Sequence, residues 1–193
     1  MINNSSILLS FLLFLSVIGY HKNMAKLPVK TFPDKVLKEK TSPVTDFDSD
    51  LQKLIDDMIE TMYAAPGVGL AANQVGISRQ LVVIDASARD ENSSLIVLIN
   101  PEIVCAEGTE DSEEGCLSLP EYTTVIKRAK KIKVKGLDRE GEPLEIESDG
   151  FLAKVLQHEI DHLNGMLLID RIGRIKREFF NKRYAREQTA GKK

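Results

Sequence analysis

In the stretch "VLQHEIDHLNG" (residues 155–165), His158 and His162 are four residues apart, with Glu159 between them. On an α-helix, residues four apart lie one above the other on the same face, so both imidazoles can reach one cation. Glu159 lies about 100° around the helix axis, within reach of a water at that cation. The stretch therefore predicts a metal-binding helix, although a pattern this short also arises by chance as a pair of surface histidines.

The helix that carries this stretch is expected to start near Ser148 or Asp149 and to run to about Leu163, where Gly165 ends it. A second, amphipathic helix is predicted over residues 48–67, because its apolar residues recur at helical spacing and Pro66-Gly67 follows them. Asp48 or Ser49 can cap its start. The apolar positions of this helix are Leu51, Leu54, Ile55, Met58, Ile59 and Met62.

Between these helices the pattern is typical of strands. Residues 80–86 and 95–104 are apolar runs that predict buried strands, and residues 131–148 predict a hairpin around Asp138–Gly141. In the hairpin, apolar residues alternate with lysines on one arm and with glutamates on the other, so the charges pair across the strands. The expected fold class is α+β, with antiparallel β-sheets packed around the central metal-binding helix, an N-terminal-side helix and a C-terminal helix.

Composition limits the class of protein. The chain has 193 residues, 42% of them hydrophobic, which suits one globular domain with additional ends. Its 26 basic and 29 acidic residues give a net charge of −3, so we expect no DNA partner. Cys105 and Cys116 are too few for a disulfide framework, although one bridge could form in an oxidising compartment. Cys105 is expected to be a buried strand residue.

The N-terminal residues 1–23 are expected to lie outside the fold. The apolar run at residues 7–19 is thirteen residues long, whereas a membrane span takes about 20, so no membrane association is expected. The run has the length of a signal-peptide core, but "MINNSS" before it lacks the usual positive charge. Translation starting at Met24 is the alternative explanation.

A catalytic metal site needs a third protein ligand. One metalloprotease pattern continues as HExxHxxGxxH, but Leu168 stands where its third histidine would be. Glu178 and Glu187, the downstream carboxylates that a different metalloprotease class would use, lie in the basic C-terminal segment. Upstream, Cys116 in "EEGCLSLP" (residues 113–120) offers a thiolate, which is a strong ligand. A lone cysteine is more often a small buried hydrophobe, but beside an incomplete histidine pair Cys116 becomes the natural third ligand.

Three segments, "GVGLAANQ" (67–74), "EGCLS" (114–118) and "HEIDHLNG" (158–165), resemble in order and spacing the three signature motifs of the peptide deformylases. The resemblance covers about residues 24–170. It implies a catalytic domain at 24–170, after the apolar extension 1–23 and before a basic helix or tail at 171–193.

The resemblance implies that Cys116, His158 and His162 bind one divalent ion. Ferrous iron is the usual native ion of that family, and zinc, nickel or cobalt can replace it. The implied reaction removes the N-formyl group from the methionine of nascent polypeptides, releasing formate. Glu159 is expected to act as general base and then as general acid. The side-chain amide of Gln74 and the backbone N–H of Leu117 are expected to stabilise the oxyanion.

Other residues have two interpretations each. Gln74 could instead be an exposed polar residue after a turn. Asp161 either orients a histidine or is an exposed helix residue. Gly67 and Gly69 are substrate-binding candidates because glycines let a peptide approach closely, but they could merely end a helix. Val68, Phe151 and Val155 are candidates for an apolar pocket, and core packing explains them equally well.

The basic segment at 171–193 contains nine Lys or Arg and two Glu. Its simplest interpretation is a solvated helix with a frayed end. A cationic tail also suits an anionic partner, so ribosome contact through RNA is a further expectation. The implied substrate places the protein in the cytoplasm, while the run at 7–19 leaves an organellar or exported form open.

Overall fold

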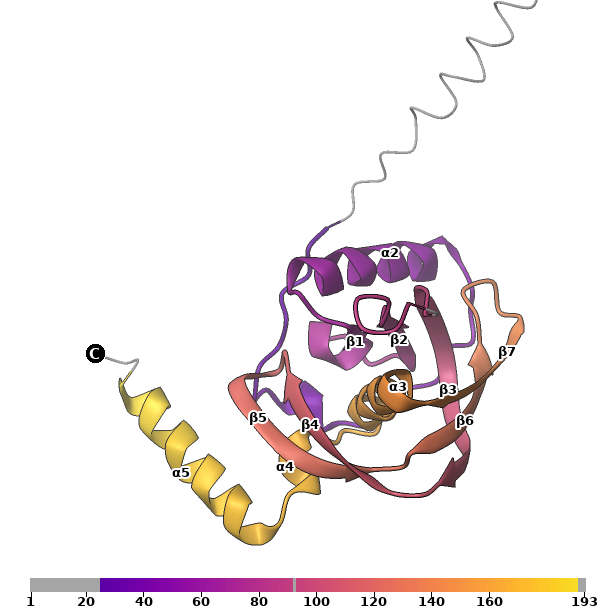
Figure 1. Cartoon of the computed structure of the whole chain (residues 1–193). Helices are drawn as coiled ribbons and strands as arrows, with labels where there is room; N and C mark the ends of the chain where they lie inside the picture. Colours follow the sequence, from indigo (N-terminus) through magenta and orange to yellow (C-terminus); the bar gives the residue numbers. More distant parts are fainter. Residues whose placement is uncertain (1–24, 92, 191–193) are drawn as a thin grey trace, which may run out of the picture.

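The computed structural model of the chain describes residues 25–91 and 93–190 (Figure 1). The expectations for residues 1–23, including the apolar run at 7–19, lie outside the described residues. No helix within the described ranges is long and apolar enough to cross a membrane.

Helix α2 (Ser49–Ala64) confirms the amphipathic helix predicted over residues 48–67. Asp48 Oδ1 accepts a hydrogen bond of 2.9 Å from the N–H of Leu51, which caps the start of the helix. At the other end, the N–H of Gly67 donates to the carbonyl of Met62 at 3.0 Å. Gly67 therefore helps to end α2, as one of its two interpretations proposed.

An antiparallel five-stranded sheet forms the centre of the fold, with strand order β1-β2-β3-β6-β7. The hairpin between its last two strands turns where the sequence predicts, since the N–H of Gly141 donates to the carbonyl of Asp138 at 3.2 Å. The predicted charge pairs form across it, for example between Lys133 and Glu145 at 2.6 Å. The strands are β1 (Gly69–Ala71), β2 (Leu81–Ile84), β3 (Ile96–Glu107), β6 (Lys131–Leu137) and β7 (Pro143–Asp149).

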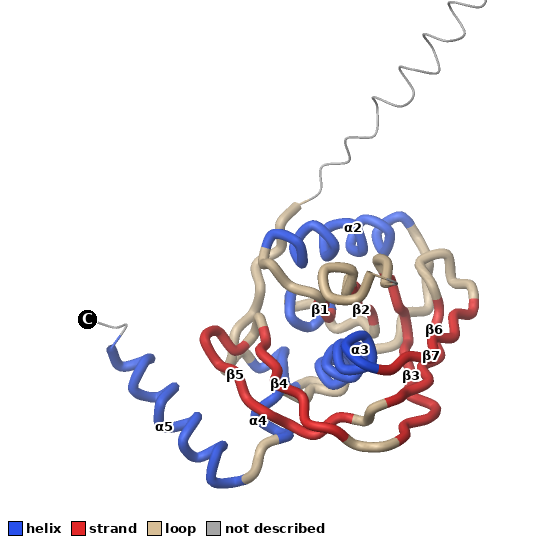
Figure 2. Tube along the Cα trace, viewed as in Figure 1, coloured by secondary structure: helices blue, strands red, loops and turns tan. Residues whose placement is uncertain are grey.

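Helices cover this sheet on both faces around β2. Leu81 and Val83 belong to the core cluster that includes the apolar face of α2, whereas Val82 and Ile84 belong to the cluster of helix α3 (Gly150–Leu163). Successive side chains of a strand point to opposite faces, so a strand covered on both faces is apolar throughout. Figures 1 and 2 show α2 and α3 on opposite sides of this part of the sheet. Helix α3 is the predicted metal-binding helix, and its bounds agree with the prediction.

The second half of β3 departs from expectation. Leu98 and Ile99 are buried, but the pairing with β6 shifts register after Ile99, and the strand then leaves the core. Cys105 pairs opposite Lys133, and its Sγ lies 3.6 Å from Glu107 Oε1 on the charged face of the sheet. Cys105 is exposed, so its prediction as a buried residue is wrong. Both cysteines are free thiols, and no bridge joins them.

A second, two-stranded sheet was not predicted. Strands β4 (Glu110–Cys116) and β5 (Leu119–Arg128) pair antiparallel. Buried Leu119 and Ile126 form a third core cluster with residues of the short helix α4 (Leu168–Arg171) and the segment before it. In Figure 2 this hairpin lies beside α3, away from α2. The hairpin brings the end of β4 to the metal-binding helix.

The C-terminal helix α5 (Arg174–Ala190) extends from the body of the protein (Figure 1). It is attached by aromatic side chains, because Phe180 is only 8% exposed and lies between Phe32 and Tyr122, with ring centroids 5.7 and 4.7 Å away. The neighbouring Phe179 is 69% exposed. The antiparallel sheets, the central helix and the two flanking helices confirm the α+β expectation. Two short 3-10 turns, η1 (Lys35–Lys38) and η2 (Ala72–Val75), complete the described elements.

Candidate metal centre and active site

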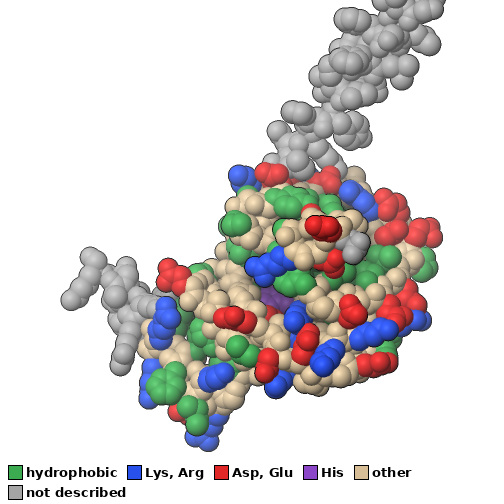
Figure 3. Space-filling model, viewed as in Figure 1, with side chains coloured by type: hydrophobic (Ala, Val, Ile, Leu, Met, Phe, Trp, Pro, Cys, Tyr) green, Lys and Arg blue, Asp and Glu red, His purple; other side chains and the backbone are tan. Residues whose placement is uncertain are grey.

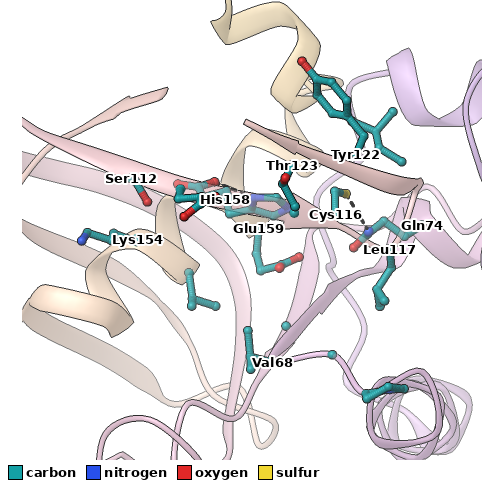
Figure 4. Close-up of a pocket in the computed structure, with 18 of the residues that line it drawn as sticks. Val68, Gln74, Ser112, Cys116, Leu117, Tyr122, Thr123, Lys154, His158 and Glu159 are labelled. Atoms are coloured by element: carbon teal, nitrogen blue, oxygen red, sulfur yellow. Dashed lines mark hydrogen bonds and ion pairs between the residues drawn. The ribbon is translucent and has the colours of Figure 1, made fainter. Parts of the chain in front are cut away.

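The three candidate ligands meet in the structure. His158 and His162 project from one face of α3, with ring centroids 4.9 Å apart, and Cys116 ends β4. Cys116 Sγ lies 3.2 Å from His162 Nε2. One ligand atom from each of the three residues lies within 4.8 Å of the others. Figure 4 shows Cys116 and His158 facing the same cavity.

The chemistry of this group fits a transition-metal ion. A thiolate and two imidazoles form a donor set that several such ions accept, and three protein ligands leave one position open. Burial lowers the pKa of His162 well below its usual value, which favours the neutral imidazole that a ligand must be. Burial acts in the same direction on His158, but its bonds to Cys116 and Glu114 outweigh burial and raise its pKa well above the usual value, so binding of an ion would displace a proton from this ring. Glu159 Oε2 is buried and has no hydrogen-bond partner among the described residues. A water held at the ion would supply the donor that this oxygen lacks.

Glu159 is enclosed by its surroundings. Its side chain is buried, and burial raises its pKa to about 7. A Cβ atom at Gly69 would lie 2.4 Å from Glu159 Oε1, closer than side chains tolerate. A side chain at Gly69 would therefore displace the carboxylate of Glu159 where β1 passes it, and the helix-ending interpretation applies only to Gly67.

Gln74 lies in η2 with its side chain 1% exposed, so the interpretation as an exposed residue is wrong. Its Oε1 accepts from the N–H of Ala71 at 2.9 Å, which orients the amide. Its Nε2 then donates to Ser118 Oγ at 3.2 Å and towards Cys116 Sγ at 3.7 Å. Figure 4 shows Leu117 beside Gln74 at this end of the cavity.

A carboxylate that the sequence analysis missed holds His158. The Nδ1–H of His158 donates to Glu114 Oε2 at 2.9 Å, and Arg128 donates to both oxygens of Glu114, each at 2.9 Å. Burial favours a higher pKa for Glu114, but its bonds to Arg128 and His158 outweigh burial and hold the pKa at about 2. Glu114 is thus an ionised acceptor that fixes the ring orientation. The sequence could have indicated this role, because Glu114 is two residues before Cys116 and so lies on the same face of the strand.

Neither interpretation of Asp161 is correct. Asp161 is buried and accepts hydrogen bonds from Arg128 and from Arg171 of α4. No hydrogen bond joins it to a histidine among the described residues. The buried carboxylate of Asp161 thus connects α3 to β5 and α4, and the two guanidinium groups compensate its charge.

Two of the three candidate ligands, Cys116 and His158, line a cavity of about 740 Å³. Its apolar wall includes Val68, Phe151 and Val155, which also pack against the core cluster of α3. In Figure 4, Ser112 and Lys154 lie at one end of the cavity, Gln74 and Leu117 at the other, and His158 and Glu159 between them. Ten of the candidate site residues line this cavity: Gly67, Val68, Gly69, Gln74, Cys116, Leu117, Phe151, Val155, His158 and Glu159. His162 does not line it, but its Nε2 lies 3.2 Å from Cys116 Sγ at the metal centre.

Comparison with known proteins gives a consistent result. The family model described as polypeptide deformylase matches residues 26–178. A peptide deformylase of Thermodesulfovibrio yellowstonii is 59% identical over 161 residues, which cover 83% of this chain and 98% of that protein. A peptide deformylase of Syntrophobacter fumaroxidans is 51% identical over 164 residues, covering 85% and 96%.

Solved structures agree with the sequence relatives. The crystal structure of a peptide deformylase from Legionella pneumophila has a TM-score of 0.78 and 45% identity, covering 86% of this chain and 98% of that one. A peptide deformylase from Ehrlichia chaffeensis, solved in complex with actinonin, has a TM-score of 0.80 and 38% identity, covering 85% and 98%. The chain therefore belongs to the polypeptide deformylase family, metal-dependent hydrolases that remove the N-formyl group from nascent polypeptides.

Proposed function

We propose that this chain deformylates nascent polypeptides that begin with N-formylmethionine, using one divalent ion held by Cys116, His158 and His162. The observation that carries the proposal is the convergence of three ligand atoms within 4.8 Å beside a buried carboxylate oxygen that lacks a partner. Glu159 would be unnecessary at a purely structural metal site, and a structural site would not leave a coordination position open.

In this proposal the ion, when bound, supplies a Lewis acid that acidifies water and polarises the formyl carbonyl. Glu159 takes a proton from the attacking water and later delivers it to the leaving nitrogen. Gln74 Nε2, oriented through the bond of its Oε1 to Ala71, donates to the developing oxyanion together with the N–H of Leu117. Glu114 holds the ring of His158 while Arg128 holds Glu114, so the ligand geometry persists through the reaction.

The methionine side chain is proposed to occupy the apolar wall formed by Val68, Phe151 and Val155. Phe151 and Val155 precede His158 by seven and three residues on α3 and therefore share its face. Gly67 and Gly69 let the peptide backbone pass close to β1. In this proposal the methionine side chain lies beside the ion and the formyl group lies between Glu159 and Gln74.

We infer that ferrous iron is the native ion, with zinc, nickel and cobalt as substitutes. Iron bound by a thiolate is sensitive to oxygen, so activity should decay in air as iron and Cys116 oxidise. Metal analysis of anaerobically purified protein, followed by timed exposure to air of the iron and nickel forms, tests this. Equal air stability of the two forms would contradict the assignment.

We also propose that residues 24–170 form the catalytic domain and that the basic segment 171–193 contacts ribosomal RNA. The charge of α5 supports the second proposal, since Arg174, Lys176, Lys182 and Arg183 all lie on its described part. Sedimentation with ribosomes should weaken when the segment is deleted, and unchanged binding would remove the proposal.

Because nascent formylated chains are the substrate, we place the enzyme in the cytoplasm, and N-terminal sequencing of native protein decides whether residues 1–23 belong to it.

The direct test of the activity is formate release from formyl-Met-Ala-Ser by anaerobically purified protein. The acetylated peptide and an internal peptide of the same composition should not be cleaved. Cleavage of internal bonds without formate release would instead indicate a metallopeptidase.

A further inference from the structure

A four-residue segment, residues 65–68, links α2 to β1 and forms part of the wall of the active-site cavity. Pro66, Gly67 and Val68 line the cavity. A Cβ atom at Gly67 would lie 3.0 Å from Leu117 Cδ1, so the segment also contacts a proposed oxyanion donor. In Figure 3 the histidine surface lies in a recess of this face, below the part of the molecule that contains α2. The position of segment 65–68 therefore shapes the cavity between α2 and the metal centre.

Backbone hydrogen bonds tie this segment to two different elements. The N–H of Gly67 donates to the carbonyl of Met62, in α2, at 3.0 Å. The carbonyl of Val68 accepts from the N–H of Asp85 at 2.9 Å, directly after the end of β2. The first half of the segment is thus held by α2 and the second half by Asp85.

A side-chain hydrogen bond joins these two attachments. Tyr63 lies in the last turn of α2 and is 51% exposed, yet its hydroxyl donates to Asp85 Oδ2 at 2.5 Å. The other oxygen, Asp85 Oδ1, accepts from the N–H of Ser87 at 3.0 Å, which orients the carboxylate. Asp85 therefore binds Val68 through its backbone and Tyr63 through its side chain, and so connects the two ends of the segment.

Both groups are in the protonation state that this bond requires. The hydrogen bond to Asp85 raises the pKa of Tyr63 to about 12, so the phenol keeps its proton. The bonds from Ser87 and Tyr63 lower the pKa of Asp85, so its carboxylate is ionised at neutral pH. A hydroxyl that donates to an ionised carboxylate forms a stronger bond than one between two neutral groups.

We propose that Tyr63 and Asp85 are positioning residues, which hold segment 65–68 in the conformation that binds the formylmethionine side chain. Among the residues that the structure describes, the cavity is lined by Gly67 and Val68 but by neither Tyr63 nor Asp85, so the pair acts through the segment. Figure 4 shows Val68 on the wall of the cavity next to Glu159. This inference rests on the proposed deformylase activity and adds two residues outside the cavity to it.

Hydrogen exchange of the metal-loaded protein without substrate tests the positioning directly. In Tyr63→Phe the amides of Gly67 and Asp85 should exchange about threefold to tenfold faster. Exchange follows the population in which the segment is open, and the loss of one hydrogen bond shifts that population by about this factor.

Tyr184→Phe is the matched control. The hydroxyl of Tyr184 also donates a bond of 2.5 Å, to the carbonyl of Phe32, and it lies outside the cavity. This variant loses a comparable bond, so a general loss of stability would appear in it too. Its amides at Gly67 and Asp85 should nevertheless exchange as in the unmodified protein.

Kinetics connect the segment to substrate binding. For formyl-Met-Ala-Ser, KM of Tyr63→Phe should rise about threefold to tenfold with kcat unchanged, because the peptide selects the competent conformation before it reacts. Asp85→Ala should raise KM at least as much, and adding Tyr63→Phe to it should have no further effect, since the bond is already lost. KM of Tyr184→Phe should equal that of the unmodified protein.

Unchanged exchange at Gly67 and Asp85 in Tyr63→Phe would overturn the proposal. Equal acceleration in Tyr184→Phe, or a fall in kcat with KM unchanged, would overturn it as well. Absence of formate release by the unmodified protein would contradict the proposed function instead, while the exchange experiment would still decide whether Tyr63 and Asp85 hold the segment.

Discussion

Gly69 leaves no room for a side chain beside the proposed general base. In Gly69→Ala the new methyl group would meet Glu159 Oε1 at 2.4 Å, so the carboxylate has to move. A displacement of about 1 Å at a catalytic group can cost about 100-fold in rate. We expect kcat for formyl-Met-Ala-Ser to fall by about that factor, while the bound metal, measured by elemental analysis, stays at the level of the unmodified protein.

Gly173→Ala is the matched control, since no atom lies within 4 Å of a Cβ placed there and Gly173 lies between α4 and α5, away from the cavity. Its kcat should be unchanged. A Gly69→Ala variant as active as this control would show that Glu159 does not depend on the close approach of β1.

A second prediction for a single residue concerns the metal affinity of a Glu114 variant. Removing its charge in Glu114→Gln weakens the bond that orients His158 and leaves buried Arg128 without one of its two acidic partners. Loss of such a partner typically lowers metal affinity about 10-fold to 100-fold. Competition with a chelator measures the affinity.

Glu113→Gln removes the same charge from the neighbouring residue, which is exposed and, among the described residues, forms no hydrogen bond or ion pair with His158 or Arg128. Its metal affinity should match that of the unmodified protein. Equal loss of affinity in both variants would mean that net charge, rather than the bond to His158, is responsible.

Among the secondary-structure elements, α5 is attached by specific side chains. Phe180 is buried against Phe32 and Tyr122, whereas adjacent Phe179 is largely exposed. Burial of a phenylalanine side chain contributes about 2 kcal/mol, so Phe180→Ala should lower the free energy of unfolding by about that amount. Urea denaturation followed by circular dichroism measures it.

Phe179→Ala should change the free energy of unfolding by no more than about 0.5 kcal/mol. If the two substitutions cost the same, α5 does not pack on the body of the protein as described.

The elements also show which parts of the fold the sequence could predict. Local signals identified α2, α3 and the β6–β7 hairpin, because helix spacing, caps and alternation need no knowledge of distant partners. Strand β4 was missed because "EDSEEGC" is polar and buries only Ser112. The exposure of Cys105 follows from register shifts in β3 that no apolar pattern indicates.

At the scale of the whole molecule, the meeting of Cys116, His158 and His162 was predictable because three segments in a fixed order and spacing resemble the motifs of one family. The residues that hold the ligands in position could not be predicted in the same way. Arg128 is 3% exposed only because Glu114 and Asp161 reach it from two other elements, and a sequence pattern does not predict the burial of an arginine. The roles of the site residues remain a proposal, which one variant tests most directly.

That measurement is metal content and formate release determined on the same anaerobic preparation of Glu159→Ala. If Cys116, His158 and His162 hold the ion and Glu159 transfers the proton, the variant keeps one ion per chain and releases formate about 10²-fold to 10⁴-fold more slowly. Loss of the ion together with activity, or turnover that persists with the ion in place, would contradict this account.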